Sequence, residues 1–351
     1  MSELDQALDL FYPCSPEFAG GLSNHGSMVA EALHALGHDA LIAAWTEVYL
    51  PRLEDWEPGE PVPAQDRESA LGSGNFADWM ATFLPRLEGV PWQPCLREWL
   101  PRLLPGFFSA AGHGPIRLAH AVRALEEEDN PTRRRELAAA LAYWASSFRT
   151  LPGEPATAPS SGKSPAVLLA ETRLVPPQRR RQGFLVDAVL VLDDDPEFAR
   201  CMGEADLEQH APGELIGEIC VAAAGLYLAH PEARIAYIHA LTGPAALRRM
   251  SDHLDSTQLR RGVGYALQAT AALHVTHGEF PGAREEDPAL RALASSWDEL
   301  RYRAACSLEE HVIKLTEACW CEDRIRPDWR FRFAAADAVT NLGFSGDGRG
   351  G

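Results

Sequence analysis

Lysine is almost absent from this chain of 351 residues, in which Lys163 and Lys314 are the only two. Positive charge as a whole is scarce, because 32 lysines and arginines face 50 acidic residues and leave a net charge of −18. Nucleic acids and anionic membranes would repel so acidic a surface. We therefore expect neither a nucleic acid nor a membrane as a partner.

Long apolar runs and paired cysteines are also missing. No apolar run approaches the length of a membrane-spanning helix, and the start MSELDQALDLF lacks the basic and apolar regions of a signal peptide. The seven cysteines are odd in number and scattered, and Cys319 and Cys321 are too close for a C-x-x-C metal site. These absences predict a cytoplasmic protein.

Nucleotide-binding motifs are missing as well. The stretch SGKS at 161–164 would need glycine at position 157 to form a phosphate loop, and that residue is Thr157. No G-x-G-x-x-G follows a strand-like stretch. Neither of the common nucleotide-binding folds is indicated.

Helical periodicity is what the sequence does contain. Strand-like alternation is limited to FLVDAVLVL at 184–192, which fits a buried helix equally well. The Pro-, Ser- and Arg-rich region at about 151–182 predicts a long loop, and 344–351 a disordered tail. We predict a mainly α fold, a single large helical domain over 1–343 with a central polar or metal-binding cavity. The expected helices are 24–36, 75–86, 113–128, 133–149, 213–229, 257–276, 288–303, 307–321 and 330–341.

The chain has twelve histidines, and helical phase distinguishes those expected to face inward from those expected to face solvent. At about 100° per residue, His25 shares a face with Val29, Ala32 and Leu36, so its side chain should point inward. A core histidine with satisfied hydrogen bonds would give the same pattern. His239 likewise falls on an inward face, in IAYIHALTGPAAL.

His113 and His120 lie seven residues apart on one face of a predicted helix, near Arg117. Imidazoles and a guanidinium on one inward face suggest a polar cavity. Two turns place the histidines about 10 Å apart along the helix axis. One is therefore expected to be a ligand and the other a supporting or substrate-contacting group, and the spacing leaves open which is which.

Near the C-terminal end, EEHVIKLTEA places His311 and Lys314 three residues apart, where both can face one point. Lysine, unlike arginine, can lose its proton and be chemically modified. Against a functional role, Glu310 lies four residues before Lys314, a favourable spacing for a surface ion pair. Periodicity alone favours a solvated lysine.

Five stretches together carry a resemblance, in order, to the questin oxidase-like family: SNHGSMVAEALHALG, GHGPIRLAHAVRAL, ALAYWASSF, YIHALTGPAALR and EEHVIKLTEA. Members of this family oxidise polyketide anthraquinones and open a ring. They have been described as flavin-free, NADPH-dependent Baeyer–Villiger-type monooxygenases. They have also been described as non-haem iron dioxygenases, with four histidines and a carboxylated lysine holding the metal.

The resemblance implies an Fe(II)-dependent oxygenase that uses O2 to cleave a C–C bond in an aromatic polyketide. His311 and Lys314 would be central to catalysis, and Arg117 and Tyr143 would orient the substrate. His120 is the alternative ligand or supporting residue. The metal ligands implied are His25, His113, His239, His311 and carboxylated Lys314.

Three other readings stay open. A flavin-free monooxygenase would use NADPH and no metal. A metal hydrolase with a carboxylated lysine would resemble a β/α barrel with H-x-H after a strand, and this chain has no H-x-H. A non-catalytic helical binding protein would tolerate alanine at His239 or His311. The exact substrate and the oligomeric state are left open.

Overall fold

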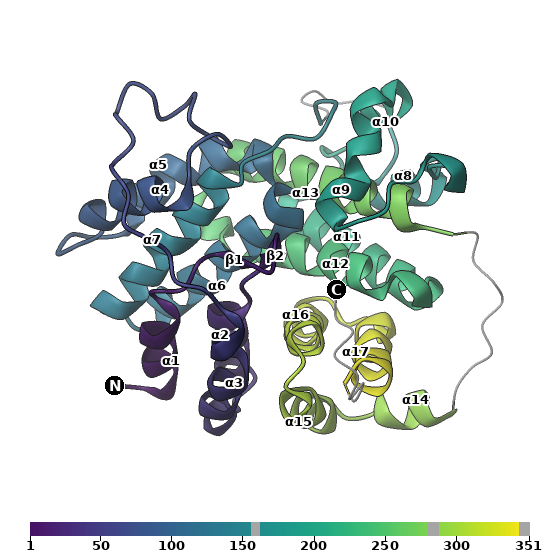
Figure 1. Ribbon diagram of the computed structural model, residues 1–351. Helices are drawn as coiled ribbons and strands as arrows, with labels where there is room; N and C mark the ends of the chain where they lie inside the picture. The colour runs from purple at the N-terminus through teal and green to yellow at the C-terminus, as the bar shows by residue number, and fades with distance from the viewer. Residues whose placement is uncertain (156–161, 280–287, 344–351) are drawn as a thin grey trace. The chain divides into compact units, whose positions relative to one another are not determined.

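The computed structural model describes residues 1–155, 162–279 and 288–343, and its elements are almost all helices (Figure 1). This confirms the predicted mainly α class. Apart from isolated bridges, the β structure of the described residues is one hairpin, β1 (Glu17–Phe18) and β2 (Leu22–Ser23). The ambiguous stretch at 184–192 is helical, with α9 (Leu185–Ala188) followed by a 3-10 turn.

The chain divides into two compact units, each taken by itself below. The first comprises Met1–Thr150 and Arg249–Gln258, and the second comprises Leu151–Arg248 and Leu259–Gly351. The single domain over 1–343 stays a prediction. The predicted disordered tail, 344–351, lies outside the described residues.

In the first unit α6 and α7 pack side by side, α4 packs on α7, and α2 contacts both α1 and α6. Helix α7 begins at Pro131, two residues before the predicted start at 133, because the Asn130 side chain caps it and proline fits its first turn. Buried tryptophans, among them Trp79 and Trp144, fill the core. The helices are α1 (Glu3–Phe11), α2 (Gly26–Ala35), α3 (Ile42–Tyr49), α4 (Phe76–Phe83), α5 (Gln93–Leu103), α6 (His113–Glu127) and α7 (Pro131–Ser146).

In the second unit α15, α16 and α17 pack on one another, and α17 also packs on α11 (Figure 1). Helix α12 ends at Arg249 and α13 begins at Ser256, so the last residue of α12 and the first residues of α13 belong to the Arg249–Gln258 segment of the first unit. The remaining helices are α8 (Pro165–Glu171), α10 (Pro196–Met202), α11 (Pro212–Ala229), α12 (Arg234–Arg249), α13 (Ser256–His277), α14 (Pro288–Leu293), α15 (Trp297–Ser307), α16 (Glu310–Ile325) and α17 (Trp329–Asn341).

Two sequence predictions about this unit were wrong. The long loop at 151–182 contains α8, whose start is capped by the side chain of Ser164. The single helix expected at 288–303 is two helices, because the Ser296 side chain caps a new one. Within the described residues, α11 is long and apolar enough to cross a membrane by length and composition, but half of it is buried, as in a core helix.

Candidate functional site

His25 lies at the N-terminal end of α2, directly after the hairpin. Its backbone N–H donates to the Tyr49 hydroxyl at 2.8 Å. The Asn24 side chain donates to the Ser15 carbonyl and accepts from the Gly26 N–H, each at 2.9 Å. His25 is buried, as its helical phase predicts. These contacts fix the backbone that carries the imidazole.

His113 is the first residue of α6 and follows an unusual left-handed turn. Ala110, Ala111 and Gly112 have φ values of 49°, 57° and 90°. Each alanine in this region costs roughly 1–2 kcal/mol. The turn lets the Ala110 carbonyl accept a hydrogen bond from His113 Nδ1 at 2.7 Å. In a neutral His113, Nε2 is then the nitrogen with the lone pair.

The two histidines meet within the first unit. Their Nε2 atoms are 2.7 Å apart, and their rings are inclined by 26° with centroids 4.7 Å apart. Two lone pairs at this distance would repel, so one ring must donate a hydrogen bond to the other. Because His113 Nδ1 donates to Ala110, a proton on His25 Nε2 would make His25 the donor.

Glycines next to His25 and His113 allow the close packing that brings the two imidazoles together. A Cβ at Gly26 would lie 2.6 Å from the Phe11 ring, and a Cβ at Gly114 would lie 2.8 Å from the Trp144 ring. Each histidine of the pair is therefore followed by a glycine whose missing side chain admits an aromatic ring. The motifs N-H-G and G-H-G reflect packing that positions the two imidazoles.

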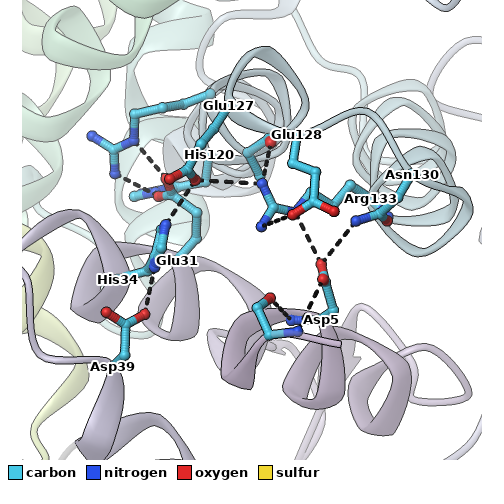
Figure 2. Close-up of polar contacts among 12 residues, drawn as sticks. Asp5, Glu31, His34, Asp39, His120, Glu127, Glu128, Asn130 and Arg133 are labelled. Carbon is cyan, nitrogen blue, oxygen red and sulfur yellow. Dashed lines mark hydrogen bonds and ion pairs between the residues drawn. The ribbon is translucent and has the colours of Figure 1, made fainter.

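His120 belongs to a different cluster (Figure 2). Its Nδ1 lies 2.5 Å from Glu31, which also binds Arg123 through two hydrogen bonds. Burial lowers the pKa of His120. Burial alone would raise the pKa of Glu31, but Arg123 and His120 hold it well below its usual range. Of the two histidines on α6, the structure pairs His113 with His25 and places His120 in this buried ion cluster.

Arg117 and Tyr143 are buried in the first unit and contact protein groups. Arg117 donates to both oxygens of Glu136, at 2.7 and 2.9 Å. The Tyr143 hydroxyl lies 2.7 Å from Ser23 Oγ and donates to Glu17 at 3.1 Å. These contacts tie α6, α7 and the hairpin together, and the substrate-orienting role of both residues stays a prediction.

In the second unit His239 lies buried in the middle of α12. Pro244 lies inside α12 and has no N–H to donate to the Ala240 carbonyl. The Thr270 hydroxyl from α13 donates to that carbonyl at 3.0 Å. The helix therefore continues through the proline. The His239 ring lies 5.7 Å from the His311 ring, centroid to centroid.

His311 is held by the residue that caps its helix. One oxygen of Glu309 accepts from the Val312 N–H at 2.7 Å, and the other lies 3.2 Å from His311 Nδ1. Burial would raise the pKa of Glu309, but the hydrogen bond to His311 helps hold it below the usual value. A carboxylate on Nδ1 makes Nε2 the lone-pair nitrogen of a neutral imidazole, as in many metal sites.

Lys314 is the most unusual residue of α16. It is only 2 % exposed, and within the described residues its ammonium forms no hydrogen bond or ion pair, including with Glu310. Burial lowers its pKa to about 8, and Glu310 and Glu309 counter this only in part. The reading of Lys314 as a solvated surface lysine is wrong. At pH 7 roughly a tenth of such an amine is neutral.

A cavity of about 400 Å³ in the second unit is lined by other residues, including Arg180, His230 and His277. His230 Nδ1 donates to the Leu226 carbonyl and His277 Nδ1 lies 3.2 Å from the Leu273 carbonyl. These histidines cap the ends of α11 and α13. No predicted site residue lines this cavity.

Sequence reasoning missed the groups that orient the two histidines, the Ala110 carbonyl and Glu309. Glu309 carried a signal, because an acidic residue at a helix start often caps it. The left-handed turn carried none, because alanine rarely adopts it. No protein-family model and no protein of curated function matches the sequence.

Proposed function

We propose that the protein is a non-haem Fe(II) oxygenase that uses O2 to cleave a C–C bond in an aromatic, anthraquinone-like polyketide. One observation carries the metal-dependent part of this proposal. Lys314 is buried without a hydrogen-bonding or ionic partner among the described residues, three residues after His311. Burying an unpaired ammonium costs several kcal/mol, so a structure that retains one has a use for the amine.

Carboxylation would give the amine that use. The lone pair of neutral Nζ attacks the carbon of CO2, one N–H proton leaves to solvent, and an anionic carbamate remains. The pKa of about 8 makes the neutral amine accessible near neutral pH. Arginine could not react in this way, since its guanidinium stays charged. The carbamate would supply a negative oxygen ligand next to imidazole nitrogens, a donor set that suits Fe(II).

The histidines fit the same role within each unit. His113 is oriented through Nδ1 by the Ala110 carbonyl, and His311 by the Glu309 carboxylate. Outer contacts of this kind fix the tautomer of metal-binding histidines. That His25 and His113 share one ion with His239, His311 and Lys314 comes from the resemblance.

Bound iron would supply electron transfer to O2 and Lewis acidity toward a phenolic oxygen. The protein's own residues hold the site: Nδ1 of His113 and of His311 keep their protons, and the buried surroundings limit water. The substrate class also comes from the resemblance. Tyr143 and Arg117 are the proposed contacts that orient it.

Metal analysis tests the proposal. Protein purified without oxygen and supplied with Fe(II) and bicarbonate should hold about one iron per chain. His25→Ala and His311→Ala should each abolish binding, because all ligands would serve one ion. His277→Ala is the matched control, since this histidine caps a helix, and it should keep the iron. Wild-type protein without iron would refute the proposal and direct attention to NADPH binding.

A further inference from the structure

The cavity of about 400 Å³ in the second unit is large enough for a small molecule and contains none of the predicted site residues. We infer that it is a binding site for a small organic anion, whose carboxylate or phosphate group is bound by Arg180 and Arg181 near the charged ring of His230. The site is independent of the proposed function, because no predicted metal ligand lines the cavity.

Among the lining residues, His230 is buried and carries a positive charge. Both of its ring nitrogens face backbone carbonyls: Nδ1 lies 2.8 Å from the Leu226 oxygen, and Nε2 lies 2.9 Å from the Glu279 oxygen. A carbonyl oxygen only accepts hydrogen bonds, so each contact needs an N–H on the ring, and only the doubly protonated imidazolium has both. The Tyr237 ring stacks on His230 with centroids 4.9 Å apart, which favours a cation.

Arg180 brings a second cation to the cavity and has hydrogen-bonding capacity to spare. Its Nε donates to the Val175 carbonyl at 3.0 Å, and one of its terminal nitrogens donates to the Gly278 carbonyl. A guanidinium has several further N–H groups, and these two bonds leave most of them available. Neither Arg180 nor Arg181 forms an ion pair among the described residues. The planar fork of arginine suits the paired oxygens of a carboxylate or phosphate.

Two glutamates that also line the cavity do not neutralise these cations. Glu232 and Glu279 are both exposed, and neither pairs with an arginine among the described residues. Water screens exposed carboxylates strongly, whereas a charge removed from water acts through a lower effective dielectric constant. The buried charge of His230 therefore outweighs the two carboxylates inside the cavity. An anion is favoured there, although the chain as a whole carries a net charge of −18.

The size of the cavity and the state of His277 narrow the class of ligand. A cavity of about 400 Å³ has room for more than a bare inorganic ion, so the anionic group is expected to belong to an organic molecule. His277 Nδ1 lies 3.2 Å from the Leu273 carbonyl, and burial lowers the pKa of the ring. A neutral His277 with its proton on Nδ1 keeps a lone pair on Nε2, which accepts a hydrogen bond. A hydroxylated organic anion matches this combination of donors and acceptor.

Calorimetric titration of the metal-free full chain with malate, and separately with glycerol 3-phosphate, tests this inference. At least one of these probes should bind saturably, with one molecule per chain. Arg181→Gln, at an exposed position, should raise the Kd at least about threefold. Arg179→Gln is the matched control, because it removes the same charge from a nearby residue that lies 3.8 Å from Asp195 and does not line the cavity. It should bind as wild type.

Glu232→Gln should tighten binding, because it removes a carboxylate that opposes the anion. Binding of only one probe would support the site and identify its anionic group as a carboxylate or a phosphate. Equal losses in Arg179→Gln and Arg181→Gln would show diffuse attraction to the surface and overturn the inference, as would saturable binding of neither probe. Arg181→Gln should hold as much iron as wild type, so a failure of anion binding leaves the proposed function standing. Thermal unfolding checks that the variants fold.

Discussion

Replacing Lys314 with methionine should stabilise the metal-free protein at neutral pH. Burial lowers the pKa of Lys314 from 10.5 to about 8. A shift of that size corresponds to about 3 kcal/mol, since each pKa unit is worth about 1.4 kcal/mol. The folded state binds its proton less tightly than the unfolded state. The penalty is therefore complete below pH 8, and it fades as the pH rises from about 8 to 10.5.

Urea unfolding in CO2-free, metal-free buffer from pH 6 to pH 10 measures this effect. Lys314→Met, which keeps most of the volume, should exceed wild type by up to about 3 kcal/mol at pH 7, and the difference should shrink toward pH 10. Lys163→Met is the control, because Lys163 is exposed and paired with Glu171 and Glu204. Its effect should stay within about 0.5 kcal/mol. A Lys314→Met variant no more stable than wild type at pH 7 would show that the ammonium has a partner or access to water.

Three further predictions concern the packing around the candidate residues. Burial would lower the pKa of His34, but hydrogen bonds to Asp39 and Glu127 raise it (Figure 2). These contacts therefore stabilise the fold at pH values below the unfolded-state pKa and lose their effect as pH rises through the folded-state pKa. Urea unfolding should show His34→Asn less stable than wild type at pH 5 and nearly equal at pH 9. Thr270→Val leaves the Ala240 carbonyl unsatisfied and should cost about 1–3 kcal/mol in the same assay, more than Thr276→Val, whose hydroxyl bonds only within its own helix. Gly114→Ala forces a Cβ against Trp144 and should lower both the thermal midpoint and the affinity for Fe(II), and unchanged values would show that α6 and α7 can separate freely.

The helical class could be read from periodicity because most helices have one apolar face. Lys314 could not be placed in this way. Helix α16 packs against both α15 and α17, and every residue from Val312 to Cys319 is buried. A helical wheel assumes a solvent-exposed side, and this segment has none. Burial on all sides depends on neighbouring helices that the local pattern does not reveal.

The candidate histidines show a similar limit. Phase on α6 placed His113 and His120 on one face and could not distinguish them. Their surroundings differ because Ala110 adopts a left-handed conformation near one and Glu31 of another helix meets the other. The first depends on local strain and the second on a contact between residues far apart in sequence. Neither has a sequence signature that spacing could detect.

The two lysines of this lysine-poor chain lie in opposite surroundings. Lys163 is exposed and sits between two glutamates, where arginine would form the same ion pairs. Lys314 is buried where a permanent charge would be costly, and only an amine can shed its proton there. A chain that otherwise uses arginine for positive charge has kept lysine at the position where neutrality matters. That choice favours a chemical role for the amine over a packing role, because leucine or methionine would pack as well at lower cost.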